Sequence, residues 1–160
     1  MKPLIASLLI LSVAAPLFAV DGDKAAYVGG TFAPYAGLDD VEGPLLTADP
    51  HALTLAPKHR DALVIPWSAI LDLEYGQKAG RRVGLAVGLA LVNPIGLATL
   101  FSKKRKHYVT IGYTDASGAE QVAVIELGKD IVRTTLAVVE TRSGKAITYQ
   151  DDEARKASRN

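Results

Sequence analysis

The stretch Gly80–Lys106 reads GRRVGLAVGLALVNPIGLATLFSKKRK, and the rest of the chain is organised around it. The 19 residues from Val83 to Phe101 carry no charge, and no Asp or Glu occurs between Tyr75 and Thr114. Basic residues flank the run on both sides. A long uncharged run with basic flanks is typical of a segment that contacts a membrane.

The run is long enough for a single membrane span but is interrupted in its middle. As one straight helix, Val83–Phe101 would be about 28 Å long, against about 30 Å for a hydrocarbon core. Asn93-Pro94 lies at the centre, where proline removes a backbone donor and disfavours helix in the residue before it. The sequence therefore predicts an inserted apolar hairpin over residues 80–102, with arms near Val83–Val92 and Ile95–Phe101. A single span and a hairpin packed on the domain in water are the alternatives.

Two sets of residues in and around this hairpin are candidate site residues. Gly80, Gly84 and Gly88 are four residues apart, so on a helix they form a smooth face for helix–helix packing. The basic flanks are predicted to contact anionic lipid headgroups, each at about 1 kcal/mol near a charged surface. These residues are Arg81, Arg82, Lys103, Lys104, Arg105 and Lys106.

The N-terminal segment predicts export. Met1–Ala19 has a charged Lys2, an apolar run over Leu4–Ala15 and a small residue at its end, which is the pattern of a secretory signal peptide. An uncleaved anchor is the alternative. Without Lys2, the chain has 17 basic residues (18 − 1) against 17 acidic ones, so net charge does not predict nucleic-acid binding. With no Cys, disulfides, thiolate nucleophiles and cysteine metal sites are excluded.

Residues 20–149 are predicted to form one domain of seven strands and one helix. Alternating apolar residues and turn residues predict the following strands: Ala26–Phe32, Leu45–Ala48, Ala52–Ala56, Ala62–Ile65, Ala69–Tyr75, His107–Thr114 and Ala119–Leu127. Lys129–Ser143 carries an apolar stripe at helical spacing and is followed by Gly144, a good helix stop. The charged tail, residues 150–160, is expected to be frayed or disordered.

Two passages resemble bacterial pleckstrin-homology-like (PH-like) and GRAM-like domains. They are ALVIPWSAILDLEY at Ala62–Tyr75 and LGKDIVR at Leu127–Arg133, where the final helix begins. The resemblance covers Tyr27 to about Thr148. It implies a mainly β (α+β) fold, with a partly open seven-stranded barrel and a C-terminal amphipathic helix. It also implies binding or scaffolding rather than catalysis. If strands five and six share one barrel, Tyr75 and Tyr108 must lie on the same side of any bilayer.

The sequence offers little sign of catalysis. His51, His59 and His107 have no second ligand at helical or strand spacing, so no metal or other cofactor is expected. An enzyme would need a cleft that joins distant groups such as His59, Asp61 and Glu74. The single tryptophan, Trp67, is expected to pack in the core rather than to anchor at a membrane interface.

We therefore expect a non-enzymatic exported binding or scaffolding domain in the periplasm or cell envelope. Its expected partners are a membrane lipid surface and either a protein partner or further copies of the chain, with no nucleic acid. The alternative is a soluble envelope protein that self-associates through the glycine-spaced hairpin.

Overall fold

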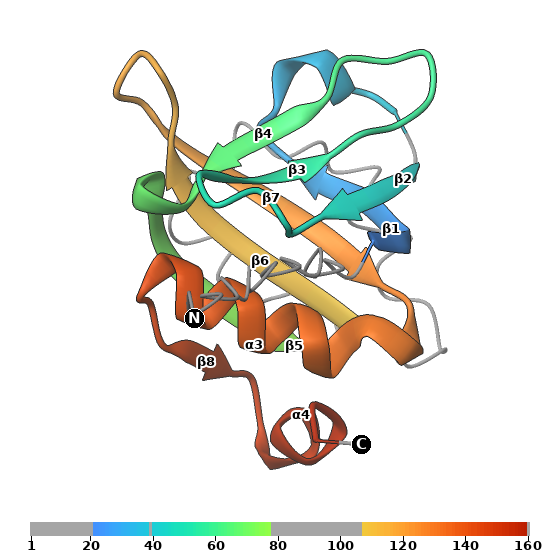
Figure 1. The fold of residues 1–160 in the computed structure, drawn as a ribbon, viewed down its shortest axis with the longest axis vertical. Coiled ribbons are helices and arrows are strands. Elements are labelled where there is room, and N and C mark those ends of the chain that lie inside the picture. The colour runs from blue at the N-terminus through green and yellow to red at the C-terminus, as the bar shows by residue number, and fades with distance from the viewer. Residues whose placement is uncertain (1–20, 39, 78–106, 160) are drawn as a thin grey trace, which may run out of the picture.

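The computed structural model describes residues 21–38, 40–77 and 107–159. In these residues it contains eight strands, two α-helices and three short 3₁₀ helices (Figure 1). The strands are β1 Asp21–Gly30, β2 Val41–Leu46, β3 Ala52–Leu55, β4 Leu63–Pro66, β5 Ile70–Gly76, β6 His107–Thr114, β7 Glu120–Leu127 and β8 Ile147–Tyr149. The helices are η1 Ala33–Tyr35, η2 Trp67–Ala69, η3 Lys129–Ile131, α3 Val132–Ser143 and α4 Asp152–Ala157.

All eight strands belong to one sheet that curls into an open half-barrel. The strand order is β4-β3-β2-β1-β7-β6-β5-β8, and every pair is antiparallel except β5 with β8. The core fills the concave side, where α3 packs beside β5 and β6 (Figure 1). The largest side chains buried almost completely are Tyr35, Tyr75, Leu45, Leu53, Leu55, Leu63, Ile65, Ile70, Leu73, Ile111, Ile125 and Val124. Burial of such apolar surface is the main stabilising contribution to a fold of this size.

The predicted mainly β class with a C-terminal helix is confirmed. The predicted pairing of the last two long strands is confirmed as well, because β6 and β7 stay in register from His107↔Leu127 to Thr114↔Glu120. The helix begins as η3 and continues as α3 to Ser143. It stops at Gly144, which has a φ of 67° and donates its N–H to the Glu140 carbonyl. Trp67 is 4% exposed, as expected for a core residue.

Two parts of the strand prediction are wrong at their boundaries. β1 spans Asp21–Gly30 rather than Ala26–Phe32, and β2 spans Val41–Leu46 rather than Leu45–Ala48. Gly43 and Pro44 are residue types that disfavour strands, but both fit within β2. Pro44 has no N–H, yet its carbonyl still accepts the Ala56 N–H at 3.0 Å. The tertiary pairing with β1 therefore overrides this local preference.

The described sheet has one strand more than the seven predicted, and part of the tail that was expected to be frayed is helical. An eighth strand, β8, pairs in parallel with β5, and the segment expected to be frayed contains α4. The Asp151 side chain caps α4 by accepting the Ala154 N–H at 2.7 Å. Ala154 itself is fully buried. A cap and one buried small residue therefore order a segment whose composition is mostly charged.

The signal segment 1–19 and the apolar insertion 80–102 lie outside the described residues. Among the helices that are described, none is long and apolar enough to cross a membrane.

Candidate functional site

All nine candidate site residues predicted from the sequence also lie outside the described residues. These are the basic residues Arg81, Arg82, Lys103, Lys104, Arg105 and Lys106, and the glycines Gly80, Gly84 and Gly88. The structure does describe the two strands to which the apolar segment is attached. β5 and β6 are antiparallel neighbours, and their pairing runs to Gly76↔Tyr108. The segment therefore leaves and rejoins the sheet at the same end of two adjacent strands, which we call the attachment end.

Aromatic contacts hold the attachment end together. The Tyr75 hydroxyl and His107 Nδ1 are hydrogen-bonded at 2.5 Å, and their rings are stacked. Tyr149 meets the Tyr75 ring edge-on, and the Arg155 guanidinium lies 5.5 Å from the centre of the Tyr149 ring. Burial raises the pKa of Tyr75 to about 12 and lowers the pKa of His107. Both rings are therefore neutral near pH 7, so the pair is held by packing and one neutral hydrogen bond.

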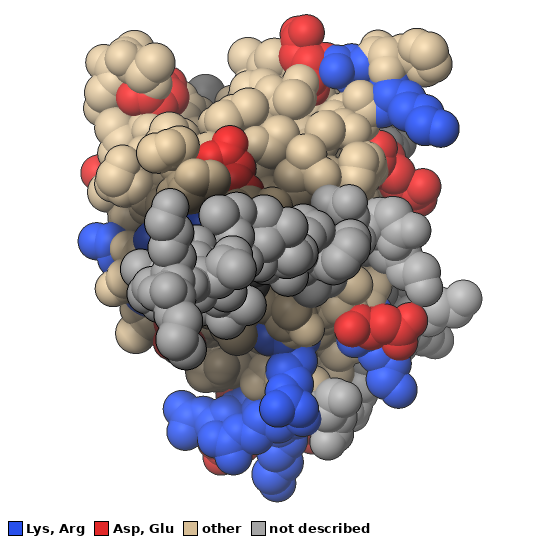
Figure 2. All heavy atoms as spheres, in the orientation of Figure 1, with Lys and Arg blue, Asp and Glu red and all other residues tan. Residues whose placement is uncertain are grey.

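Basic side chains gather near this end. The Gln150 N–H donates to the Tyr75 carbonyl, so the chain that leads into α4 lies beside the end of β5. The last turn of α4 carries Arg155 and Lys156. Figure 2 shows Lys and Arg side chains grouped at the end of the molecule where Figure 1 places α4. The first turn of the same helix carries Asp152 and Glu153, so its positive charge is confined to the last turn, which is the part that suits an anionic partner.

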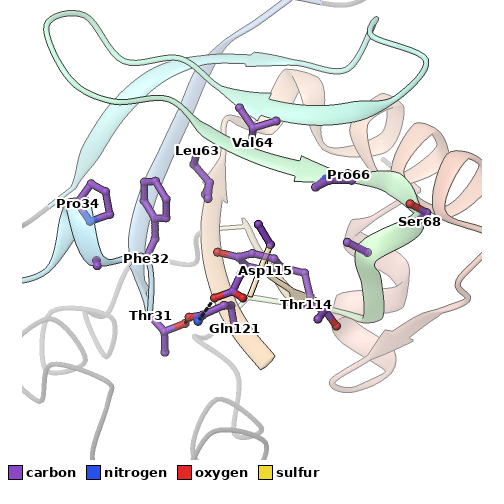
Figure 3. A pocket seen from close by; sticks show the side chains of 14 residues that line it. Thr31, Phe32, Pro34, Leu63, Val64, Pro66, Ser68, Thr114, Asp115 and Gln121 are labelled. Atoms are coloured by element: carbon purple, nitrogen blue, oxygen red, sulfur yellow. Dashed lines mark hydrogen bonds between the residues drawn. The ribbon is translucent and has the colours of Figure 1, made fainter. Parts of the chain in front are cut away.

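A pocket of about 530 Å³ lies at the opposite end of β6, which we call the pocket end (Figure 3). Three parts of the chain form it: the segment from β1 to η1, the segment from β4 to η2, and the turn between β6 and β7. The lining residues are Thr31, Phe32, Ala33, Pro34, Leu63, Val64, Pro66, Ser68, Ala69, Tyr113, Thr114, Asp115, Ala116 and Gln121. Most of these are apolar, and none is Lys or Arg.

Asp115 gives the pocket a fixed negative charge. Its Oδ1 accepts hydrogen bonds from the Ser117 N–H, the Ser117 hydroxyl and the Ala119 N–H, while its Oδ2 accepts from Gln121 Nε2. These four hydrogen bonds, of which the one from the Ser117 hydroxyl has the largest effect, lower the pKa of Asp115 to about 2. Each of them favours the ionised carboxylate over the neutral acid. Gln121 in turn accepts a hydrogen bond from Thr31 Oγ1 at 2.5 Å, which joins β7 to the end of β1.

The other side of the pocket is the free edge of the sheet. Among the described strands, β4 is the first in the sheet order and pairs only with β3. The backbone N–H of Trp67 donates to the His51 carbonyl. Ile65 and Leu63, two and four residues earlier, face β3 in the same way. By alternation, the N–H and C=O of Val64 point away from β3. The Val64 side chain is 52% exposed.

Catalytic or metal chemistry gains no support from the positions of the candidate residues. Within residues 21–38, 40–77 and 107–159, no three His, Cys, Asp or Glu side chains are grouped to hold a metal ion. His51 and His59 are exposed, each in the loop before a strand. Asp61 precedes β4, whereas Glu74 is buried on β5 with its Oε1 accepting from Gln150 Nε2. The described contacts thus do not join these groups into one site.

The pocket was not predicted from the sequence. Its walls come from residues more than 80 positions apart, and its apolar members are ordinary strand and turn residues. The one local signal is Asp115-Ala-Ser-Gly118, the turn sequence between the predicted strands His107–Thr114 and Ala119–Leu127. In comparisons with known proteins, no family model matches the chain, and no curated protein matches it either.

Proposed function

We propose that this chain is an exported, non-enzymatic binding or scaffolding domain attached to the envelope membrane through the apolar hairpin at residues 80–102. The observation that carries the proposal is the pairing of β5 with β6 up to Gly76↔Tyr108. Neighbouring strands lie about 4.8 Å apart, whereas a membrane span separates its ends by about 30 Å. A segment joining these strands must therefore return to the side from which it started.

The charge at the attachment end supports contact with an anionic surface. Arg155 and Lys156 lie in α4, beside the end of β5. The basic flanks of the hairpin, 81–82 and 103–106, are joined to the same two strands. An apolar insertion surrounded by basic side chains would combine hydrophobic and electrostatic attraction to a bilayer.

The strand arrangement supports the PH-like part of the proposal. The curled sheet, with a helix after the last long strand packed against its concave side, is the arrangement that the resemblance implies. In this proposal the described sheet is a partly open PH-like or GRAM-like barrel, extended by β8 at one edge, and the hairpin is an insertion between its fifth and sixth strands.

Liposome flotation of residues 20–160, the chain that remains once the predicted signal peptide is removed, tests the attachment. Vesicles of phosphatidylcholine with about one third phosphatidylglycerol would be used at low and at high salt. We expect flotation that survives high salt and is lost when Leu89 and Leu97 are both changed to Asp. Leu71 is the matched control, because it is an apolar residue on β5 that is 42% exposed. Leu71→Asp should float like the unchanged chain.

Other results would contradict the proposal. Flotation that is lost in high salt would leave only a basic surface contact, and flotation retained in the Leu89→Asp, Leu97→Asp variant would rule out insertion through the hairpin. Absence of flotation, together with oligomers that form without lipid and are weakened by Gly84→Leu, would favour the self-associating envelope protein instead.

A further inference from the structure

We propose that the pocket between β4 and the β6–β7 turn binds an extended, apolar peptide segment of a partner protein that carries a Lys or Arg. The segment would lie along the free edge of β4 as an added strand. This inference goes beyond membrane attachment and does not depend on it. It rests on three features: backbone groups that no described strand pairs, an apolar pocket beside them, and a negative charge on the opposite wall.

The backbone of β4 supplies the first feature. Because the N–H and C=O of Val64 point away from β3, they can pair with a strand added about 4.8 Å away. Pro66 lacks an N–H, and as the N-cap of η2 its carbonyl accepts the first hydrogen bond of that helix, so Val64 supplies both groups. The edge thus offers one donor and one acceptor, which suits a short extended segment rather than a long strand.

The side chains around the edge supply the second feature. Val64 and Pro66 are exposed on β4, and Phe32 and Pro34 face the same space from the β1–η1 segment (Figure 3). A pocket of about 530 Å³ has room for a few side chains. In an added strand, alternate side chains point to the same face, so every second residue of the peptide would enter the pocket. Apolar residues at those positions would match its lining.

Charge supplies the third feature. Asp115 stays ionised at neutral pH because four hydrogen bonds hold its carboxylate, and its Oδ2 accepts only one of them. With no Lys or Arg among the lining residues that the structure describes, and with the carboxylate of Asp115 among them, the pocket favours a cation over an anion. A fatty acid would place its carboxylate beside Asp115, whereas a peptide with a basic residue would gain a charge-assisted hydrogen bond.

The position of the pocket fits a partner that approaches from away from the bilayer. β6 begins at the attachment end and finishes beside the pocket, so the two ends are about 23 Å apart at roughly 3.3 Å per residue. A chain attached to a membrane at one end would present the pocket end to the surrounding compartment.

Fluorescence anisotropy on the full chain tests the proposal. The probe is a labelled seven-residue peptide of alternating valine and threonine with a lysine at each end. A second probe has glutamate in place of lysine. Two further probes carry backbone N-methyl groups on alternate residues, one at the odd positions and one at the even positions. We expect the lysine peptide to bind about threefold or more tightly than the glutamate peptide, and one N-methyl register to abolish binding.

Variants of the protein locate the site. Val64→Pro removes the N–H that faces the free edge and keeps every N–H that faces β3, so it should weaken the lysine peptide about fivefold, the effect of one backbone hydrogen bond. Asp115→Asn should reduce the preference for lysine over glutamate. Leu71→Lys changes a comparably exposed apolar residue on β5 and should leave binding unchanged.

Three results would overturn the inference. One is no binding of the lysine peptide up to about 1 mM. Another is equal binding of both N-methyl registers and the parent peptide, which would exclude strand addition and needs no protein variant. The third is dodecanoate that saturates the site and displaces the peptide, since this would assign the pocket to an acyl chain.

Discussion

Gly30→Ala should destabilise the fold far more than Gly118→Ala, although both glycines have positive φ angles. At Gly30, φ is +133°, and an added Cβ would lie 2.1 Å from the Val122 carbonyl oxygen. The end of β1 would have to move about 1 Å away from β7, which would break the Thr31 N–H to Val122 carbonyl bond of 2.9 Å. At Gly118, φ is +87° and nothing lies within 4 Å of the added Cβ.

The expected cost follows from these contacts. The positive φ costs about 1–2 kcal/mol at either site. At Gly30, the lost hydrogen bond and the displaced strand end add about 2–3 kcal/mol, for a total of about 4. With a urea m-value of about 2 kcal/mol per molar, the unfolding midpoint should fall by about 2 M for Gly30→Ala and by about 0.5–1 M for Gly118→Ala.

Urea unfolding followed by Trp67 fluorescence measures both variants, since Trp67 is the one tryptophan and is buried. Equal midpoints for Gly30→Ala and Gly118→Ala would show that the close approach of β1 to β7 is not a structural constraint. A Gly30→Ala chain that fails to fold would agree with the larger cost, provided that Gly118→Ala folds normally.

Three further predictions concern other parts of the described structure. Asp115 has a pKa of about 2, below its unfolded value, so it stabilises the fold above about pH 4 and this stabilisation is lost as pH falls towards 2. In acid, the free energy of unfolding should therefore fall more steeply for the unchanged chain than for Asp115→Asn. Trp67→Phe loses the hydrogen bond from Nε1–H to the Asp49 carbonyl and should cost about 2 kcal/mol of stability. This cost should not add to that of Arg142→Ala, because Arg142 donates to the same carbonyl and lies over the indole ring. Ala154→Glu should detach α4, with faster amide exchange confined to about residues 147–158, whereas Asp151→Ala should cost about 1 kcal/mol in the same segment.

The elements with a strong local pattern could be predicted from the sequence. β6 and β7 alternate regularly around a four-residue turn, and α3 has an apolar stripe that ends at a glycine in the left-handed conformation. In each case the local signal and the tertiary contacts agree. Alternation within a strand and helical spacing are local properties, so they can be recognised before any partner is known.

The elements that depend on distant partners could not be predicted. β8 has three residues and is a strand only because Ile147–Tyr149 pairs with β5. β2 contains Gly43 and Pro44, which are residue types that disfavour strands, and is held between β1 and β3. The pocket could not be predicted for the same reason, because it lies beside an edge strand and the sequence does not show which strand is at the edge.

The strand that was missed changes the mechanics of the attachment end. In a seven-stranded sheet with this order, β5 would be an edge strand, and the apolar segment would be attached to a strand paired on one side only. β8 pairs with Leu73, Glu74 and Tyr75, and the Gln150 side chain contacts Gly76 so closely that a Cβ there would meet it at 1.8 Å. β5 is therefore paired on both sides along the part nearest the attachment. A load applied through the apolar segment would act on an internal strand, which must break pairing with both neighbours before it can leave the sheet. β8 and Gln150 thus secure the strand from which the apolar insertion begins, and this holds whether the insertion enters a bilayer or packs against another protein.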